Sequence, residues 1–273
     1  MSRGTEELRC EAGADGTGAR PFGADTGSPL AAPPMHCPDI VCDPGNQVLG
    51  EEHAYQAAWE RFRFLEHKLR RVRETRPLQS LLVTSPIPAE GKTVVAINLA
   101  ITLARNSPGV LLVDGDLRRP GIQRTLALPA LPGVAECLEA GADLASAIRL
   151  VTPFGFYYLP CGTSRANPLD LLQRPATSAL LRRLRGFEWA VVDSPPIEPF
   201  ADAQCLARHV DGVLLVVRAG VSKRSDLRDA LAALDREVTI GLVFNACDNH
   251  RHDRYYGRYR TSAKPSPADE GRI

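Results

Sequence analysis

A glycine, a lysine and a threonine at positions 91–93 follow a short apolar run, and this order of residues suits phosphate binding. The run Leu81–Val83 predicts a buried strand, and a helix is predicted from Thr93 onward. Backbone N–H groups of the loop and the helix N-terminus can hold phosphate oxygens, with the Lys92 ammonium at the β- and γ-phosphates and the Thr93 hydroxyl on magnesium. The full loop pattern has a glycine where this chain has Pro86. The triplet alone therefore leaves an ordinary helix N-cap as an alternative.

Acidic residues follow two further apolar runs. Asp114 and Asp116 come after Val110–Val113, and Asp193 comes directly after Ala190–Val192. Each aspartate taken singly is also typical of a turn or a helix cap, but that alternative explains three of them at matching strand ends poorly. In a parallel sheet the ligand binds at the carboxyl ends of the strands, and carboxylates beside a triphosphate need a cation with oxygen ligands. The sequence thus predicts a magnesium–nucleotide site.

Six apolar runs alternate with helical patterns between residue 79 and residue 245. They lack the polar alternation of a half-exposed strand, so helices must cover both faces of the sheet they form. We expect an α/β fold with a mostly parallel, doubly wound sheet. The predicted strands are Leu81–Val83, Val110–Val113, Phe156–Leu159, Ala190–Val192, Val213–Val217 and Ile240–Phe244.

An amphipathic helix is predicted over residues 51–74, ahead of the first of these strands. Its apolar side chains recur at steps of three and four residues, which places them on one face. That face either packs on the domain behind it or forms a subunit interface. The stripe consists of Tyr55, Ala58, Phe62, Leu65, Leu69 and Val72.

The two ends of the chain differ in composition from the middle. Residues 1–48 hold seven glycines and six prolines and little apolar surface, which predicts a disordered arm. Residues 248–273 are polar and predict a flexible tail that contains tyrosines. One domain over residues 49–247 remains between them.

Composition excludes several classes of protein. Over 273 residues the formal net charge is +1, which argues against nucleic-acid binding through bulk charge. No apolar run reaches the roughly 18 residues of a membrane span, and the N-terminus lacks the apolar core of a signal peptide. Seven cysteines without a CxxC pair indicate reduced thiols. We therefore expect a cytoplasmic protein.

Several motifs in order resemble the bacterial tyrosine kinases of the CpsD/CapB type, P-loop proteins with a MinD/ParA-like fold. The similarity spans roughly residues 55–260. For two of the similar segments, 167–172 and 216–220, the sequence suggests no mechanism. The segments that carry the resemblance are 85–93, 112–120, 167–172, 191–196, 216–220, 241–245 and the tyrosine cluster 255–259.

The resemblance implies ATP and Mg²⁺ as cofactors and a role for each site residue. Asp114 would also orient or deprotonate the incoming tyrosine hydroxyl, and Asn245 would lie near the adenine. The implied nucleotide-binding residues are Ala89, Glu90, Gly91, Lys92, Thr93, Val94 and Asn245. The implied catalytic residues are Lys92, Asp114, Asp116 and Asp193, and the implied magnesium ligands are Thr93, Asp116 and Asp193.

The resemblance also implies what the enzyme acts on and with. Tyr255, Tyr256 and Tyr259 would accept phosphate between copies of the chain, which makes it a protein-tyrosine autokinase that regulates exopolysaccharide or capsule synthesis and export. The implied partners are a transmembrane polysaccharide copolymerase that activates it, a second copy of the chain and a tyrosine phosphatase, but no nucleic acid. It would lie at the inner face of the cell membrane through that activator.

Two positions depart from the family pattern. Ala89 stands where a glycine is usual, and it should be tolerated if this loop residue keeps φ below zero. The family's Glu-x-x-Arg-x-x-Arg motif for ring assembly aligns with Ala57, Glu60 and Arg63, so two of its three positions differ and assembly by that route is not implied.

Three other functions compete with this reading. A MinD/ParA-like ATPase switch would share the fold, but this chain has Ile87 at the position of the lysine that is diagnostic of such a switch. A regulator that binds nucleotide without turnover would fit Pro86 and Ala89. The basic residues around the tyrosines would alternatively contact a membrane surface or RNA.

Overall fold

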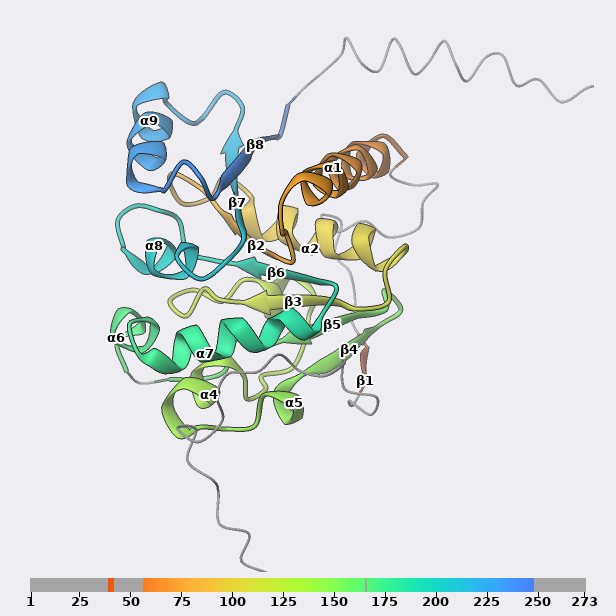
Figure 1. The fold of residues 1–273 in the computed structure, drawn as a ribbon, viewed down its shortest axis with the longest axis vertical. Helices are drawn as coiled ribbons and strands as arrows, with labels where there is room; N and C mark the ends of the chain where they lie inside the picture. Colours follow the sequence, from red (N-terminus) through yellow and green to blue (C-terminus); the bar gives the residue numbers. More distant parts are fainter. Residues whose placement is uncertain (1–38, 42–55, 165, 248–273) are drawn as a thin grey trace, which may run out of the picture.

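A single eight-stranded sheet runs through the molecule, with helices on both faces (Figure 1). The computed structural model describes residues 39–41, 56–164 and 166–247. The spatial order of the strands is β1-β4-β5-β3-β6-β2-β7-β8. The strands are β1 Asp39–Val41, β2 Ser80–Thr84, β3 Val110–Asp114, β4 Arg149–Thr152, β5 Phe156–Leu159, β6 Trp189–Asp193, β7 Gly212–Arg218 and β8 Thr239–Asn245.

The helices alternate with these strands along the chain. None of the helices in the described ranges is long and apolar enough to span a membrane. They are α1 Gln56–Thr75, α2 Lys92–Ala104, α3 Ile122–Thr125, α4 Val134–Ala140, α5 Leu144–Ala147, α6 Pro168–Leu172, α7 Pro175–Arg183, the 3₁₀ turn η1 Leu184–Gly186, α8 Asp202–Ala207 and α9 Arg224–Ala233.

The six predicted strands are all present, and they are parallel from β5 to β8. The predicted mostly parallel, doubly wound α/β fold is therefore confirmed. Two strands were not predicted: β4 is antiparallel to β5, and β1 is parallel to β4 at the edge of the sheet. β1 lies within residues 1–48, so these three residues differ from the expected disordered arm. The rest of that arm, like residues 248–273, lies outside the described residues.

Alternate residues of the central strands pack on opposite faces of the sheet. Leu112 and Val191 face the layer of α1 and α2, whereas Leu111 and Val192 face the layer of α4, α7 and α8. Both sets are buried, which explains why the strands read as continuous apolar runs. The two layers sandwich the sheet.

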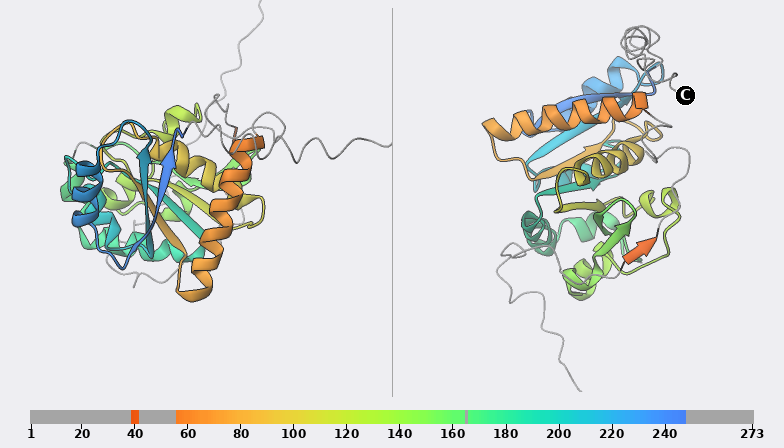
Figure 2. Two further views of the ribbon diagram at one scale, coloured as in Figure 1. Left: turned by 90° about the horizontal axis from the view of Figure 1, so that it is seen from above. Right: turned by 90° about the vertical axis from the view of Figure 1, so that its right-hand side faces the viewer.

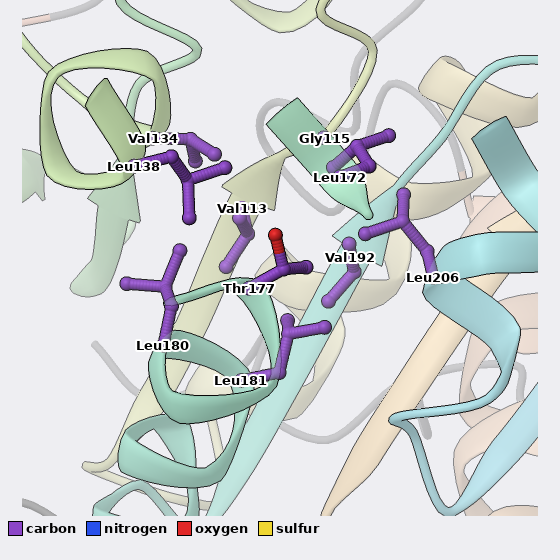
Figure 3. A pocket seen from close by; sticks show the side chains of 10 residues that line it. All are labelled: Val113, Gly115, Val134, Leu138, Leu172, Thr177, Leu180, Leu181, Val192 and Leu206. Atoms are coloured by element: carbon purple, nitrogen blue, oxygen red, sulfur yellow. The ribbon is translucent and has the colours of Figure 1, made fainter. Parts of the chain in front are cut away.

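A small apolar cavity lies within the second of these layers (Figure 3). Side chains from β3, β6, α7 and α8 line it, among them Val113, Leu180 and Leu206. The one hydroxyl there belongs to Thr177, and it donates a hydrogen bond to the Leu171 carbonyl at 3.0 Å. The cavity is thus part of the core packing and offers a polar ligand no free partner.

The leading helix α1 packs against α2 on one face of the sheet (Figure 2). Its buried side chains include Leu69 and also Trp59, which the predicted stripe had missed. The half-buried stripe residues that contact the core are Ala58, Phe62, Leu65 and Val72. The stripe therefore packs on its own domain. Residues 51–55 of the predicted helix lie outside the described part of the chain.

Candidate nucleotide site

The predicted phosphate loop connects β2 to α2 at the centre of the sheet, and Lys92 and Thr93 form the first turn of α2. Gly91 precedes the helix with φ +90°, in the left-handed region that favours glycine. A Cβ at Gly91 would lie 2.1 Å from Nδ2 of Asn245, so a larger residue there would be strained and would displace the Asn245 side chain. A Cβ added at Gly121 would lie 3.0 Å from the Thr93 Oγ1, so the glycine keeps the space beside this hydroxyl open. The loop glycine is required by the backbone.

The three aspartates meet beside this loop. Asp114 and Asp193 end the neighbouring parallel strands β3 and β6 in register, and neither is exposed to solvent. Asp116 lies 3.4 Å from the Lys92 ammonium, measured from Oδ2 to Nζ. Its other oxygen accepts hydrogen bonds from the backbone N–H groups of Arg118 at 3.3 Å and Arg119 at 2.9 Å. The structure therefore brings together the residues that the strand ends predicted.

Burial raises the pKa of two of these carboxyl groups, Asp114 and Asp193. It raises the pKa of Asp114 well above the ordinary value, and the charges of Asp193 and Asp116 raise it further. Burial also raises the pKa of Asp193 to about 7, although the positive charge of Lys92 opposes the shift. Packing three acids together without solvent costs free energy unless a cation shares the space.

A divalent cation fits this arrangement. Within the described residues, one oxygen of Asp114 and both carboxylate oxygens of Asp193 are buried without a hydrogen bond of ordinary geometry, although the Thr93 hydroxyl and the Ser194 N–H lie close enough to Asp193 to lower its pKa. Orphaned carboxylate oxygens are the ligands that Mg²⁺ prefers. The described part of the chain holds no cluster of three or more His, Cys, Asp or Glu side chains arranged as a complete metal site. A bound ion would therefore take its remaining ligands from phosphate oxygens, the Thr93 hydroxyl and water.

The condition under which Ala89 was expected to be tolerated is not met. Its φ is +63°, not below zero. An L-residue in this left-handed conformation costs roughly 1–2 kcal/mol, which the usual glycine would avoid. The alanine is accommodated, but not for the reason that the sequence suggested.

The remaining predicted residues fall into two groups. Glu90 and Val94 lie in the loop and the first turn of α2, and Asn245, at the end of β8, donates from Nδ2 to the Glu90 carbonyl at 2.9 Å. The other group lies outside the described residues: Tyr255, Tyr256 and Tyr259. At the aligned assembly motif, Glu60 and Arg63 form an exposed ion pair at 3.4 Å on α1, while the Ala57 side chain lies outside the described residues.

Two side chains near the site were not predicted. Arg118 forms a paired contact with the fully buried carboxylate of Asp202, with Nη2 at 3.0 Å from Oδ1, and its guanidinium lies over the Phe200 ring. The Tyr158 hydroxyl is buried on β5, and burial together with the Asp114 charge raises its pKa. The arginine pair 118–119 is visible in the sequence, but the contact of Arg118 with Asp202 depends on the tertiary fold.

A parallel sheet with a phosphate loop between β2 and α2, and carboxylates at the ends of β3 and β6, defines a P-loop nucleotide-binding protein. Solved structures agree with this class. The kinase domain of the Escherichia coli tyrosine kinase ETK superposes with a TM-score of 0.66 and 26% identity, over 72% of this chain and 80% of that domain. The MinD protein of Pyrococcus horikoshii shares the fold, with a TM-score of 0.51 and 21% identity over 61% of this chain and 70% of MinD.

Sequence relatives narrow the class further, although no family model matches the chain. The tyrosine-protein kinase CpsD of Streptococcus pneumoniae is 30% identical over 190 residues, which cover 67% of this chain and 84% of CpsD. The tyrosine-protein kinase YwqD of Bacillus subtilis is 28% identical over 205 residues, 74% of this chain and 86% of YwqD. The chain belongs to the family of bacterial tyrosine-protein kinases.

A longer relative is named for polysaccharide transport rather than as a kinase. The succinoglycan biosynthesis transport protein ExoP of Rhizobium meliloti is 30% identical over 181 residues. These residues cover 64% of this chain but only 23% of ExoP. The similarity is thus to a minor part of that protein.

Proposed function

We propose that this chain is an ATP-dependent protein-tyrosine autokinase that phosphorylates the tyrosines of its own C-terminal tail. The observation that carries the proposal is the convergence of Asp114, Asp116 and Asp193 on Lys92, at the helix end that follows the phosphate loop. Family membership supports a transfer to tyrosine over the simple hydrolysis of a MinD/ParA-like switch.

The side chains divide the chemistry of phosphoryl transfer. The loop N–H groups and the Lys92 ammonium would bind and orient the phosphates of ATP, and Thr93, Asp116 and Asp193 would hold Mg²⁺. When bound, Mg²⁺ supplies the positive charge that offsets both the three carboxylates and the transferred phosphoryl group. Asp114 has one buried oxygen without a partner in the described residues, which could accept the proton of a tyrosine hydroxyl.

The proposed setting is polysaccharide synthesis and export. Similarity to part of ExoP supports a membrane copolymerase as activator, which would hold the chain at the inner face of the membrane. A tyrosine phosphatase would reverse the modification. If the activator completes the nucleotide site, its cytoplasmic tail should raise autophosphorylation well above that of the isolated chain.

Labelled ATP tests the proposal. Wild-type protein with Mg²⁺ should carry label on Tyr255, Tyr256 or Tyr259, and an Asp114→Asn, Asp116→Asn double variant should lose it while keeping its fold. Free labelled phosphate without labelled protein would favour the ATPase switch, and bound nucleotide without either product would favour the inactive regulator. A double variant that labels itself at the wild-type rate would rule out this assignment of the carboxylates.

Mixing two variants tests whether transfer occurs between copies. A Lys92→Met chain keeps its tyrosines but lacks the phosphate-binding cation, whereas a chain with all three tail tyrosines changed to phenylalanine can only donate. We expect label on the Lys92→Met tail in the mixture. An unlabelled tail there, in conditions that label the wild type, would exclude transfer between molecules.

A further inference from the structure

The phosphate loop is held from outside by residues at the ends of β7 and β8. Nη1 of Arg218 donates to the Ala89 carbonyl at 3.3 Å, and Nδ2 of Asn245 donates to the Glu90 carbonyl at 2.9 Å. Arg218 and Asn245 are paired in register as the last residues of neighbouring parallel strands. Two consecutive peptide groups of the loop are therefore bound to one edge of the sheet.

A third contact fixes the side chain between these two peptide groups. Glu90 is almost fully buried, and its Oε2 accepts from the Ile87 backbone N–H at 3.2 Å. Its Oε1 accepts from the Ser222 hydroxyl. The Ser222 Oγ accepts in turn from the Arg218 backbone N–H at 3.0 Å, which closes the turn after β7. Arg218, Ser222 and Asn245 together form what we call the loop bracket.

The bracket determines where the loop N–H groups point. In a trans peptide the N–H points opposite to the C=O of the same plane. Holding the carbonyls of Ala89 and Glu90 toward Arg218 and Asn245 directs the N–H groups of Glu90 and Gly91 the other way. These are the donors that a phosphate loop presents to its ligand.

The backbone conformation of the loop also requires support. Ala89 and Gly91 both have positive φ, at +63° and +90°. For glycine this conformation is unstrained, but at Ala89 it is strained and persists only when the surrounding contacts fix it. Arg218 and Asn245 of the bracket contact the two peptide groups between residues 89 and 91.

We propose that Arg218 and Ser222 are positioning residues for nucleotide binding, because they hold the phosphate loop in the conformation that presents its N–H groups to phosphate. The proposal rests on the nucleotide binding proposed above, but not on transfer to tyrosine. The proposal gives a role to Arg218. This residue lies in the segment 216–220, for which the sequence suggested no mechanism.

The test is a titration of the full chain with a fluorescent ADP analogue and Mg²⁺. We expect Arg218→Ala and Ser222→Ala each to raise the Kd about fivefold, and the double variant to raise it at least tenfold. Arg218→Lys should recover part of the loss. Matched controls are Arg228→Ala and Ser225→Ala, since both residues lie on α9, where Arg228 contacts Asp229 and Ser225 contacts Asp226. Both controls should bind as the wild type does.

The number of binding sites separates positioning from general stability. A merely structural defect would lower the fraction of chains that bind while leaving their Kd unchanged, whereas a positioning defect raises the Kd at full stoichiometry. A double variant whose Kd stays within twofold of the wild type overturns the proposal. If Arg218→Ala fails to fold, the Kd of Ser222→Ala decides alone. Wild-type protein that binds nucleotide but labels no tyrosine would contradict the kinase proposal and leave this test intact.

Discussion

The φ of +63° at Ala89 makes this residue a point of stored strain in the phosphate loop. Replacing it with glycine removes the clash of the Cβ, which costs the folded state roughly 1–2 kcal/mol. The greater conformational entropy of glycine also stabilises the unfolded chain, by roughly 0.4–1 kcal/mol. We therefore expect Ala89→Gly to raise the free energy of unfolding by about 0.5–1 kcal/mol. Urea denaturation measures the change.

A glycine placed elsewhere serves as the control. Ala232 is exposed near the end of helix α9, so Ala232→Gly should lower the free energy of unfolding by about 0.5–1 kcal/mol. If both substitutions destabilise the protein equally, the loop alanine carries no strain.

The chemistry-bearing residues could be predicted from sequence because they follow directly from strand ends. Asp114 and Asp193 each end an apolar run, and parallel strands bring such ends to one edge of the sheet. The contacts of Arg218 and Asn245 with the loop could not be predicted, since they join positions more than a hundred residues apart. The φ of +63° at Ala89 could not be predicted either, because loop conformation depends on these same distant contacts.

At the scale of elements, Asp211 anchors the start of β2. One of its carboxylate oxygens accepts from the backbone N–H groups of Gln79 at 3.0 Å and Ser80 at 2.8 Å, and the other lies 3.1 Å from Nη2 of Arg185. The pKa of Asp211 is lowered: burial opposes the shift, but the hydrogen bonds from Ser80 and Gln79 and the charge of Arg185 outweigh it. We expect Asp211→Asn to cost about 2 kcal/mol of stability at neutral pH.

This contribution should depend on pH in a defined direction. Because the folded-state pKa lies below the unfolded one, the stabilisation is complete above about pH 4 and is lost as the pH falls through the folded value. The difference in unfolding free energy between the wild type and Asp211→Asn should therefore shrink between pH 6 and pH 3. A difference that is constant over this range would show that the ionised carboxylate is not responsible.

Helix α1 offers a matched pair of apolar side chains. Leu69 is buried against the core, whereas Phe64 is 61% exposed. We expect Leu69→Ala to cost about 2–4 kcal/mol and Phe64→Ala less than about 0.5 kcal/mol in urea denaturation. A larger cost for Phe64→Ala that grows with protein concentration would instead reveal a subunit interface on the outer face of the helix.

The strands that the sequence predicted were those with a continuous apolar run, which in β2, β3 and β6 reflects burial on both faces. The strand β4 escaped prediction because only Val151 is fully buried among its four residues, so it shows no apolar run. Trp59 was left out of the stripe on α1 although it is buried, because the tryptophan lies one position beyond Ala58 in the repeat.

For the molecule as a whole, we expect tail phosphorylation to change its association. Residues 249–264 carry five basic side chains against one acidic one, a formal charge of +4 that favours docking at the acidic site of a neighbouring copy. Each phosphotyrosine adds about −1.5 to −2 charges, so modification of the three tyrosines makes this segment net negative. Phosphorylated protein should therefore sediment as a smaller species than unmodified protein.

The three-phenylalanine tail variant is the control for this switch. It should stay associated after incubation with ATP and Mg²⁺, because its tail keeps the positive charge. Identical sedimentation of phosphorylated and unmodified wild-type protein would remove the switch while leaving the kinase assignment unaffected.

The position of β6 between β2 and β3 has a consequence for how the protein is made. The ribosome delivers the phosphate loop and Asp114 early, but these two strands cannot hydrogen-bond to each other, because the strand that belongs between them has not yet been synthesised. Until Asp193 emerges, the nascent chain exposes two apolar strand edges at the future centre of the sheet. Such edges invite pairing with other chains. The translation of β6 therefore brings the three aspartates together and covers one exposed edge each of β2 and β3, which reduces the tendency of the growing chain to aggregate.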